Sequence, residues 1–101
     1  MSDRRLQVFH AVARLLSFTK AAEVLHMTQP AVTFQIRQLE EQFDTRLFDR
    51  AHNRVSLTEA GHVAFEYAEV IFEKYSELEN TNLSDTIKGQ LQVAERLKVL
   101  M

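Results

Sequence analysis

Residues 17 to 43, SFTKAAEVLHMTQPAVTFQIRQLEEQF, predict two helices of unequal length joined by a tight connection. The first helix begins near Ser17 or Thr19, because either side chain carries an oxygen that accepts a hydrogen bond from a free backbone N–H. Its small alanines permit a close approach between helices. The inward positions of this first helix are Ala21, Ala22 and Leu25.

The second helix is longer and begins near Thr28, whose hydroxyl is a capping group. It tolerates Pro30, because a first-turn N–H has no acceptor within the helix. Its apolar side chains recur at helical spacing, and these inward positions are Val32, Ile36, Leu39 and Phe43. The opposite side presents Gln29, Thr33, Phe34 and Arg37. A polar face of this kind has no role inside a small protein, so we expect it to contact another molecule.

The segments on either side of this helix pair complete a small domain. Residues 4 to 16 predict a first core helix, whose inward positions are Leu6, Phe9, Val12, Ala13 and Leu16. Residues 44 to 57 change to an alternating pattern around a polar tip at residues 51 to 54, which predicts a two-stranded hairpin, or wing. The tip lacks an Asn-Gly pair, and its turn type is therefore left open.

A last long helix follows, capped by Thr58, with Glu59 favourably placed in its first turn. Its heptad-like apolar positions are Ala64, Ala68, Ile71, Tyr75 and Leu78. Further apolar side chains widen this surface beyond what a three-helix core covers, so we expect a partner. The helix should end near residues 80 to 82, and residues 83 to 101 are compatible with either a strand or a helix.

Composition is that of a globular protein, with 101 residues of which 46% are hydrophobic and 26% charged. There is no cysteine, and the four histidines lack the spacing of zinc ligands, so we expect no disulfide, metal or cofactor. No nucleophile constellation or glycine-rich phosphate loop indicates an enzyme. No apolar run approaches the roughly 20 residues of a membrane span, so we expect a soluble, unexported protein without membrane contact.

The net charge of −2 is divided unevenly along the chain. Residues 1 to 58 carry eight Lys and Arg against six Asp and Glu, while residues 59 to 101 carry four against eight. Phosphate binding depends on where the basic side chains lie, so an acidic total does not exclude DNA contact. The alternative for Arg46, Arg50 and Arg54 is surface pairing with neighbouring acidic side chains, which is worth only about 0 to 1 kcal/mol.

A helix, a tight connection and a second helix with an exposed polar face describe a helix-turn-helix, whose second helix lies in the DNA major groove. Gln29 has the donor and acceptor geometry to bind adenine, Thr33 offers a hydroxyl or a methyl group, and Phe34 fits a thymine methyl. Thr28 and the free N–H groups beside it suit a phosphate, as does Arg37 one turn further. In the alternative interpretation Thr28 is only a cap, Phe34 packs on another helix, and the polar residues are ordinary surface.

Over roughly residues 4 to 80 the chain resembles the amino-terminal part of a LysR-type transcriptional regulator. The positions that match the family pattern in order and spacing are Phe9, Val12, Ala13, Ser17, Phe18, Thr19, Ala21, Ala22, Leu25, Thr28, Gln29, Pro30, Ala31, Thr33, Ile36, Leu39, Glu40, Leu47, Phe48, Arg50, Leu57, Thr58, Ala60 and Gly61.

This resemblance implies a mostly α fold, a winged helix-turn-helix of three helices and a two-stranded wing, followed by a long dimerisation linker helix. It implies base contacts in the major groove from Thr28, Gln29, Pro30, Ala31, Thr33 and Phe34. It implies a wing in the adjacent minor groove, with His52, Asn53 and Arg54 at its tip. We expect phosphate contacts from Ser17, Thr19, Lys20, Arg37 and Arg50. We expect dimerisation through Ala64, Ala68, Ile71, Tyr75 and Leu78.

These expectations divide the chain into a DNA-binding domain at 1–58, a linker helix at 59–82, and a tail at 83–101 that begins a missing effector domain or is engineered. We expect a homodimeric, or higher oligomeric, bacterial transcription regulator that binds double-stranded DNA sequence-specifically at an interrupted inverted repeat. It should act in the cytoplasm at the nucleoid, and no small-molecule effector site is expected within these residues. The alternative is a dimeric protein-protein interaction module without DNA specificity, whose association would respond little to salt.

Overall fold

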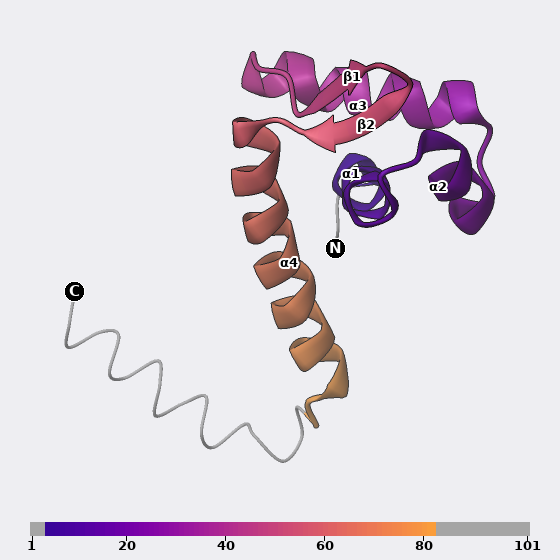
Figure 1. Ribbon diagram of the computed structural model, residues 1–101. Coiled ribbons are helices and arrows are strands. Elements are labelled where there is room, and N and C mark those ends of the chain that lie inside the picture. Colours follow the sequence, from indigo (N-terminus) through magenta and orange to yellow (C-terminus); the bar gives the residue numbers. More distant parts are fainter. Residues whose placement is uncertain (1–3, 83–101) are drawn as a thin grey trace.

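The computed structural model of the chain describes residues 4–82, which form four helices and one antiparallel pair of strands. The elements are α1 (Arg4–Leu15), α2 (Phe18–Leu25), α3 (Gln29–Phe43), β1 (Phe48–Ala51), β2 (Arg54–Leu57) and α4 (Glu59–Asn80). Figure 1 shows α1 beneath α3 and the strands, with α2 beside it, while α4 extends away from this group as a long arm. The predicted fold, a mostly helical winged helix-turn-helix followed by a long helix, is confirmed.

Three hydroxyl side chains begin three of the helices, as the sequence predicts. The oxygen of Ser17 accepts the N–H of Lys20 at 3.1 Å, so Ser17 and not Thr19 caps α2. Thr28 caps α3 and Thr58 caps α4 in the same way, by accepting an N–H three residues further on. Each cap satisfies a backbone donor that the helix itself leaves free.

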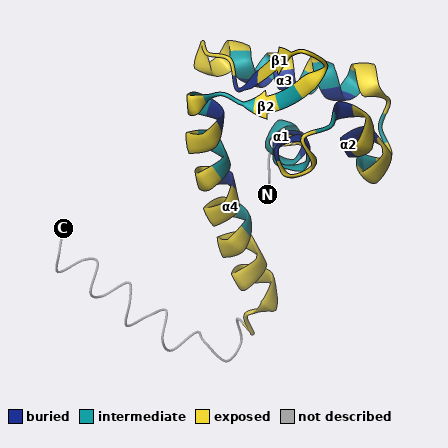
Figure 2. Cartoon of the chain, in the orientation of Figure 1, coloured by how far each residue is buried: buried dark blue, intermediate teal, exposed yellow. Residues whose placement is uncertain are grey.

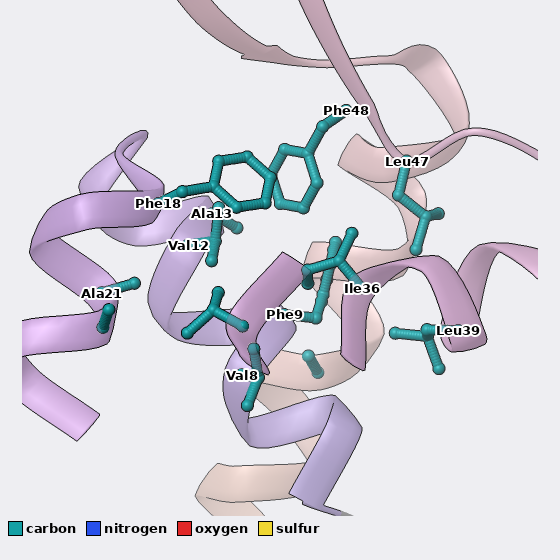
Figure 3. Packing of buried hydrophobic residues seen from close by; sticks show 13 residues of the cluster. Val8, Phe9, Val12, Ala13, Phe18, Ala21, Ile36, Leu39, Leu47 and Phe48 are labelled. Atoms are coloured by element: carbon teal, nitrogen blue, oxygen red, sulfur yellow. The ribbon is translucent and has the colours of Figure 1, made fainter. Parts of the chain in front are cut away.

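The core lies where α1, α2, α3 and the first strand meet (Figure 3). Phe9 is fully buried at its centre, and its ring lies tilted against Phe48 with 5.4 Å between ring centroids. The other buried hydrophobic residues are Val8, Val12, Ala13, Phe18, Ala21, Ala22, Val32, Ile36, Leu39, Leu47 and Ala68. The alanines of α2 are buried as predicted, and they let α2 approach α1 closely.

Two inward predictions are wrong. Leu16 is 47% exposed, because α1 ends at Leu15 and the chain turns into the left-handed region at Leu16, with φ 50°. Phe43 is 57% exposed, because it is the last residue of α3 and lies beyond the core that α1 provides. Val8, which the apolar spacing missed, is instead fully buried.

The wing is a four-residue antiparallel pair in which Phe48 lies opposite Leu57 and Ala51 opposite Arg54. His52 and Asn53 form its two-residue tip, with φ of 54° and 59°. Positive φ at both central residues is the backbone signature of a type I′ turn, whose twist matches that of the flanking strands. The structure thus decides the turn type that the sequence left open.

A carboxylate from α3 fixes the beginning of the wing. Glu40 Oε2 accepts the backbone N–H of Leu47 at 2.7 Å and that of Phe48 at 3.4 Å. Both of these residues are 2% exposed, so little water is available to replace the acceptor. Glu40 therefore ties the last turn of α3 to the first strand.

Replacing Glu40 by alanine should lower the free energy of unfolding by about 2 kcal/mol, because two poorly hydrated N–H groups lose their acceptor. Glu40→Gln should lose less, since its amide oxygen still accepts. Urea unfolding measures both. Glu41→Ala is the matched control on the exposed neighbour, and equal losses at the two positions would contradict the role given to Glu40.

The inner face of α4 packs on α1 through an aromatic cluster. The ring of His10 stacks on Phe65 at 5.4 Å and meets the edge of Phe72 at 5.0 Å. His10 Nε2 lies 3.3 Å from Glu69 Oε2, although the two atoms are not aligned for a hydrogen bond. Beyond Phe72 every residue of α4 is exposed (Figure 2), so no other residue within 4–82 covers the second half of this helix.

Ala68 is fully buried on the inner face of α4, within the core of its own domain. Its predicted contribution to a dimer contact therefore stays a prediction, and in the single chain Ala68 serves the core. Ile71, Tyr75 and Leu78 of the same predicted seam are 46%, 37% and 54% exposed.

In the described part of the chain, no helix combines the length and the apolar character that crossing a membrane requires.

Candidate nucleic-acid interface

One open face of α3 gathers most of the predicted base contacts. Gln29, Pro30, Thr33, Phe34 and Arg37 line a shared depression of about 380 Å³. Phe34 is 58% exposed, so it is not packed against another helix in the part of the chain that the structure describes. The exposed ring of Phe34 and the polar side chains around it thus lie on one open face, where they are accessible to another molecule.

Ala31 is not brought to this face. At about 100° per residue it lies roughly 200° around the helix from Gln29, and it is half-buried. Its N–H donates to the hydroxyl oxygen of Thr28 at 3.2 Å. Thr28 keeps its own hydroxyl hydrogen for a further acceptor, so its capping role and a contact to DNA are compatible.

A second hollow, of about 640 Å³, lies between the starts of α2 and α3 and the wing. It brings together Gln29 from α3, Ser17 and Thr19 from the start of α2, and Arg50 from β1. Asn53 and Arg54 line its wing side. Residues that are 36 positions apart in the sequence, such as Ser17 and Asn53, thus border one concave surface.

Lys20 and His52 lie outside both hollows. Lys20 is exposed in the first turn of α2, and His52 is exposed at the wing tip. Each is the sequence neighbour of a residue that lines the large hollow: Lys20 follows Thr19, and His52 precedes Asn53. Their contacts to DNA stay predictions.

The hydroxyl of Thr19 donates to the amide oxygen of Gln29 at 3.4 Å. This contact joins the starts of α2 and α3 and restricts the side chain of Gln29. The amide nitrogen of Gln29 takes no part in this contact, and the amide oxygen retains a second lone pair. Gln29 is thus partly oriented before any ligand is bound.

Three arginines surround a smaller hollow of about 130 Å³ that α3 and β1 border. Arg37, Arg46 and Arg50 line it, yet within residues 4–82 none of them forms an ion pair with a carboxylate. Glu40 lies among them, but its Oε2 atom is occupied by backbone N–H groups. The alternative of surface ion pairs, which the sequence left open for Arg46, Arg50 and Arg54, finds no support within residues 4–82, and these charges are available to an anion.

Arg46 was considered in the sequence analysis but was not among the predicted phosphate contacts. Its position just after α3 gave no periodic signal, and only the fold places it beside Arg37 and Arg50.

Within the described residues no three His, Asp or Glu side chains are grouped closely enough to hold a metal ion.

A helix pair with an exposed contact face on its second helix, bordered by a β-hairpin that lines the same hollow, defines a winged helix-turn-helix protein. A family profile described as "Bacterial regulatory helix-turn-helix protein, lysR family" matches residues 4–62. The chain belongs to this family, and it carries the DNA-binding domain of a LysR-type transcription regulator. The resemblance inferred from the sequence is confirmed.

Relatives and solved structures agree with this assignment. The RuBisCO operon transcriptional regulator of Allochromatium vinosum is 45% identical over 96 residues, which cover 93% of this chain and 32% of that protein. The crystal structure of the BenM_DBD/benA site 1 DNA complex has a TM-score of 0.75 at 33% identity, covering 87% of this chain and 97% of that one. The CbnR_DBD-DNA complex has a TM-score of 0.72 at 36% identity, covering 79% of this chain and 92% of that one. The chain thus spans about a third of the length of the regulator from A. vinosum.

Proposed function

We propose that this chain binds double-stranded DNA as a homodimer, with the start of α3 in the major groove and the wing in the adjacent minor groove. The observation that carries the proposal is the open face of Gln29, Thr33 and Phe34 on α3, which is bordered by arginines that form no ion pair within residues 4–82. Two of the similar structures described above are DNA complexes, which supports this assignment.

Base reading falls to the side chains that face outward from the first two turns of α3. Gln29 offers the paired donor and acceptor that adenine presents in the major groove, and Phe34 supplies an apolar surface for a thymine methyl. Arg37, Arg46 and Arg50 suit phosphates, because a guanidinium binds phosphate oxygens in pairs. At the wing, Arg54 is the cation best suited to the narrow minor groove, where negative potential is concentrated.

Selection of bound sites from a pool of random duplex DNA tests the proposed function. The expected result is an enriched, interrupted inverted repeat, since a two-fold symmetric dimer reads two half-sites. Enrichment of a single uninterrupted site would contradict the dimeric arrangement. Recovery of no preferred sequence would contradict sequence-specific binding.

Gln29→Ala and Arg37→Ala should have different consequences for the preferred site. Gln29→Ala should cost about 1 to 3 kcal/mol and relax the base preference at one position, because a bidentate base contact is lost. Arg37→Ala should weaken all sequences alike and reduce the salt slope by about one. Competition binding against single-base variants of the site measures both. Equal and sequence-independent losses would contradict the assignment of Gln29 to base reading.

The outer side of α4 supplies the proposed dimer contact. At about 100° per residue its exposed apolar side chains form one stripe, which lies roughly 60° to 160° around the helix from the buried Ala68. The stripe consists of Val63, Tyr67, Val70, Ile71 and Leu78. Val63, Tyr67 and Ile71 of this stripe line, together with Leu39 and Phe43, an apolar groove of about 400 Å³. Apolar surface that continues over several helical turns favours a second copy as its cover.

Tyr75 and Ala64 lie at the edge of this stripe, so the proposed seam is rotated relative to the one predicted from the heptad spacing.

Residues 83–101, for which the start of an effector domain was predicted, lie outside the described residues. We place the domain boundary near Thr58, where the wing ends and α4 begins. We also infer a cytoplasmic location on nucleoid DNA and a binding role without catalysis.

The alternative, a dimeric module that binds protein through the same face, makes a different prediction about salt. Exposed Phe34 alone would suit an apolar protein partner. Association through several phosphates should weaken by orders of magnitude between about 50 and 200 mM salt, whereas an apolar protein contact responds little. Binding that is unchanged over this range would favour the alternative.

A further inference from the structure

The guanidinium of Arg50 lies flat against an aromatic ring of the core. Its Cζ atom is 3.7 Å from the centroid of the Phe18 ring. Phe18 is only 5% exposed, and its edge meets Phe48 at 5.7 Å with an interplanar angle of 69°. Figure 3 shows the rings of Phe18 and Phe48 beside one another at the rim of the core. Phe18 is therefore held on several sides, and it presents one face to the arginine.

Strand alternation explains why a charged residue is in this place. Phe48 and Arg50 are two positions apart on β1, so their side chains leave the same face of the strand. Phe48 enters the core, whereas Arg50, nearer the wing tip, reaches the rim. Phe18 is the first residue of α2, directly after its cap Ser17. The stack thus joins the wing to the start of α2.

A stacked guanidinium leaves the N–H groups at its edges free to bind an anion. Arg50 makes no ion pair within residues 4–82, and it lines both the large hollow beside the wing and the smaller arginine-lined hollow. A long, unrestrained arginine loses rotamer freedom when it is fixed on a phosphate. Stacking on a rigid ring removes part of that loss before DNA arrives.

We propose that Phe18 is a positioning residue for DNA binding, whose ring fixes the Arg50 guanidinium for a backbone phosphate. The inference rests on the proposed function, in which Arg50 is a phosphate contact. It adds that a core residue without DNA contact of its own acts on affinity through Arg50. A purely structural role for Phe18 predicts an effect on DNA binding that is independent of Arg50.

A double-mutant cycle separates these two roles. Arg50→Ala should weaken binding to the selected site about tenfold, as expected for one charge-assisted phosphate contact. Phe18→Leu, which keeps an apolar side chain but removes the ring face, should weaken binding about three- to fivefold when Arg50 is present. In the Arg50→Ala background it should have almost no effect. Phe9→Leu is the matched control, a fully buried phenylalanine of the same core that does not contact Arg50.

Two outcomes of the cycle would overturn the proposal. Equal losses from Phe18→Leu in both backgrounds would show that Phe18 acts through the fold alone. No loss in the presence of Arg50 would show that the stack does not matter for binding. If the unaltered protein bound no DNA in a preferred sequence, the proposed function itself would have failed, which is a distinguishable result.

A spectroscopic measurement on the free protein completes the test without DNA. The side-chain N–H resonance of Arg50 should be shifted upfield by the ring current of Phe18, and Phe18→Leu should remove that shift. If Phe18→Leu fails to fold, Arg50→Lys replaces it in the binding measurement, because this variant leaves the core unchanged and keeps the positive charge. It should weaken binding several-fold, since an ammonium lacks the planar fork. Unaltered affinity of Arg50→Lys, or an unshifted resonance in the unaltered protein, would overturn the proposal.

Discussion

Replacing Ile71 by glutamate should convert the protein to a monomer and weaken its binding to a two-half-site DNA about a hundredfold or more. Ile71 is 46% exposed near the middle of the apolar stripe of α4, so in a two-fold symmetric pair it lies close to its own copy. Two carboxylates would then face one another in an apolar contact, where an unpaired charge is strongly unfavourable. Without the dimer, each half-site is bound alone and the linked second contact is lost.

Sedimentation equilibrium measures the oligomeric state, and titration of DNA with one or two half-sites measures the affinity. Affinity for a single half-site should be unchanged, because Ile71 is far along α4 from the start of α3. Ser76→Glu is the matched control, since it adds the same charge to an exposed position of α4 outside the stripe. A dimer that persists in Ile71→Glu at equal concentration would contradict the assignment of this surface.

Replacing Gly61 by alanine should lower the free energy of unfolding by about 3 kcal/mol. Gly61 is buried in the first turn of α4, where an added Cβ would overlap the backbone carbonyl oxygen of Leu47 and press on Leu57. The same carbonyl accepts the N–H of Thr58 at 3.0 Å, so the strand cannot retreat without loss of that hydrogen bond. The close contact joins α4 to the wing.

Whether Gly61→Ala destabilises or stabilises the protein distinguishes a steric clash from an effect of helix propensity. In a free helix Gly→Ala stabilises by about 1 kcal/mol, so a steric clash and helix propensity predict opposite directions. Urea unfolding measures the change, with Ser76→Ala as a control at an exposed position of the same helix. A more stable Gly61→Ala protein would mean that α4 and the wing are not packed as the structure has them.

Much of the DNA-contact face could be predicted from residues that are close together in the sequence. Gln29, Thr33, Phe34 and Arg37 recur at helical spacing, and that spacing alone places them on one exposed face, as the structure has them. Ala31 was included because of the family pattern, and helical geometry turns it away from that face. Arg46 was omitted because its proximity to Arg37 and Arg50 depends on how β1 returns along α3.

Local order was determined by the sequence itself. Ser17, Thr28 and Thr58 each accept an N–H three residues further on, so the starts of α2, α3 and α4 follow from contacts that a short segment already contains. The apolar periodicity likewise determined which faces of α2 and α3 turn inward, except at their ends. These features need no knowledge of the partner surfaces, because capping and helical periodicity are properties of consecutive residues.

Only the tertiary structure decided which apolar and charged side chains meet. It buried Ala68 and exposed Phe43, because α1 covers one side of α4 and stops short of the end of α3. It set Arg50 on the ring of Phe18, 32 residues earlier in the chain, and the Glu40 carboxylate on the N–H groups of β1. These contacts join segments whose separation in space is fixed by packing of the whole core, and no spacing within one segment encodes them.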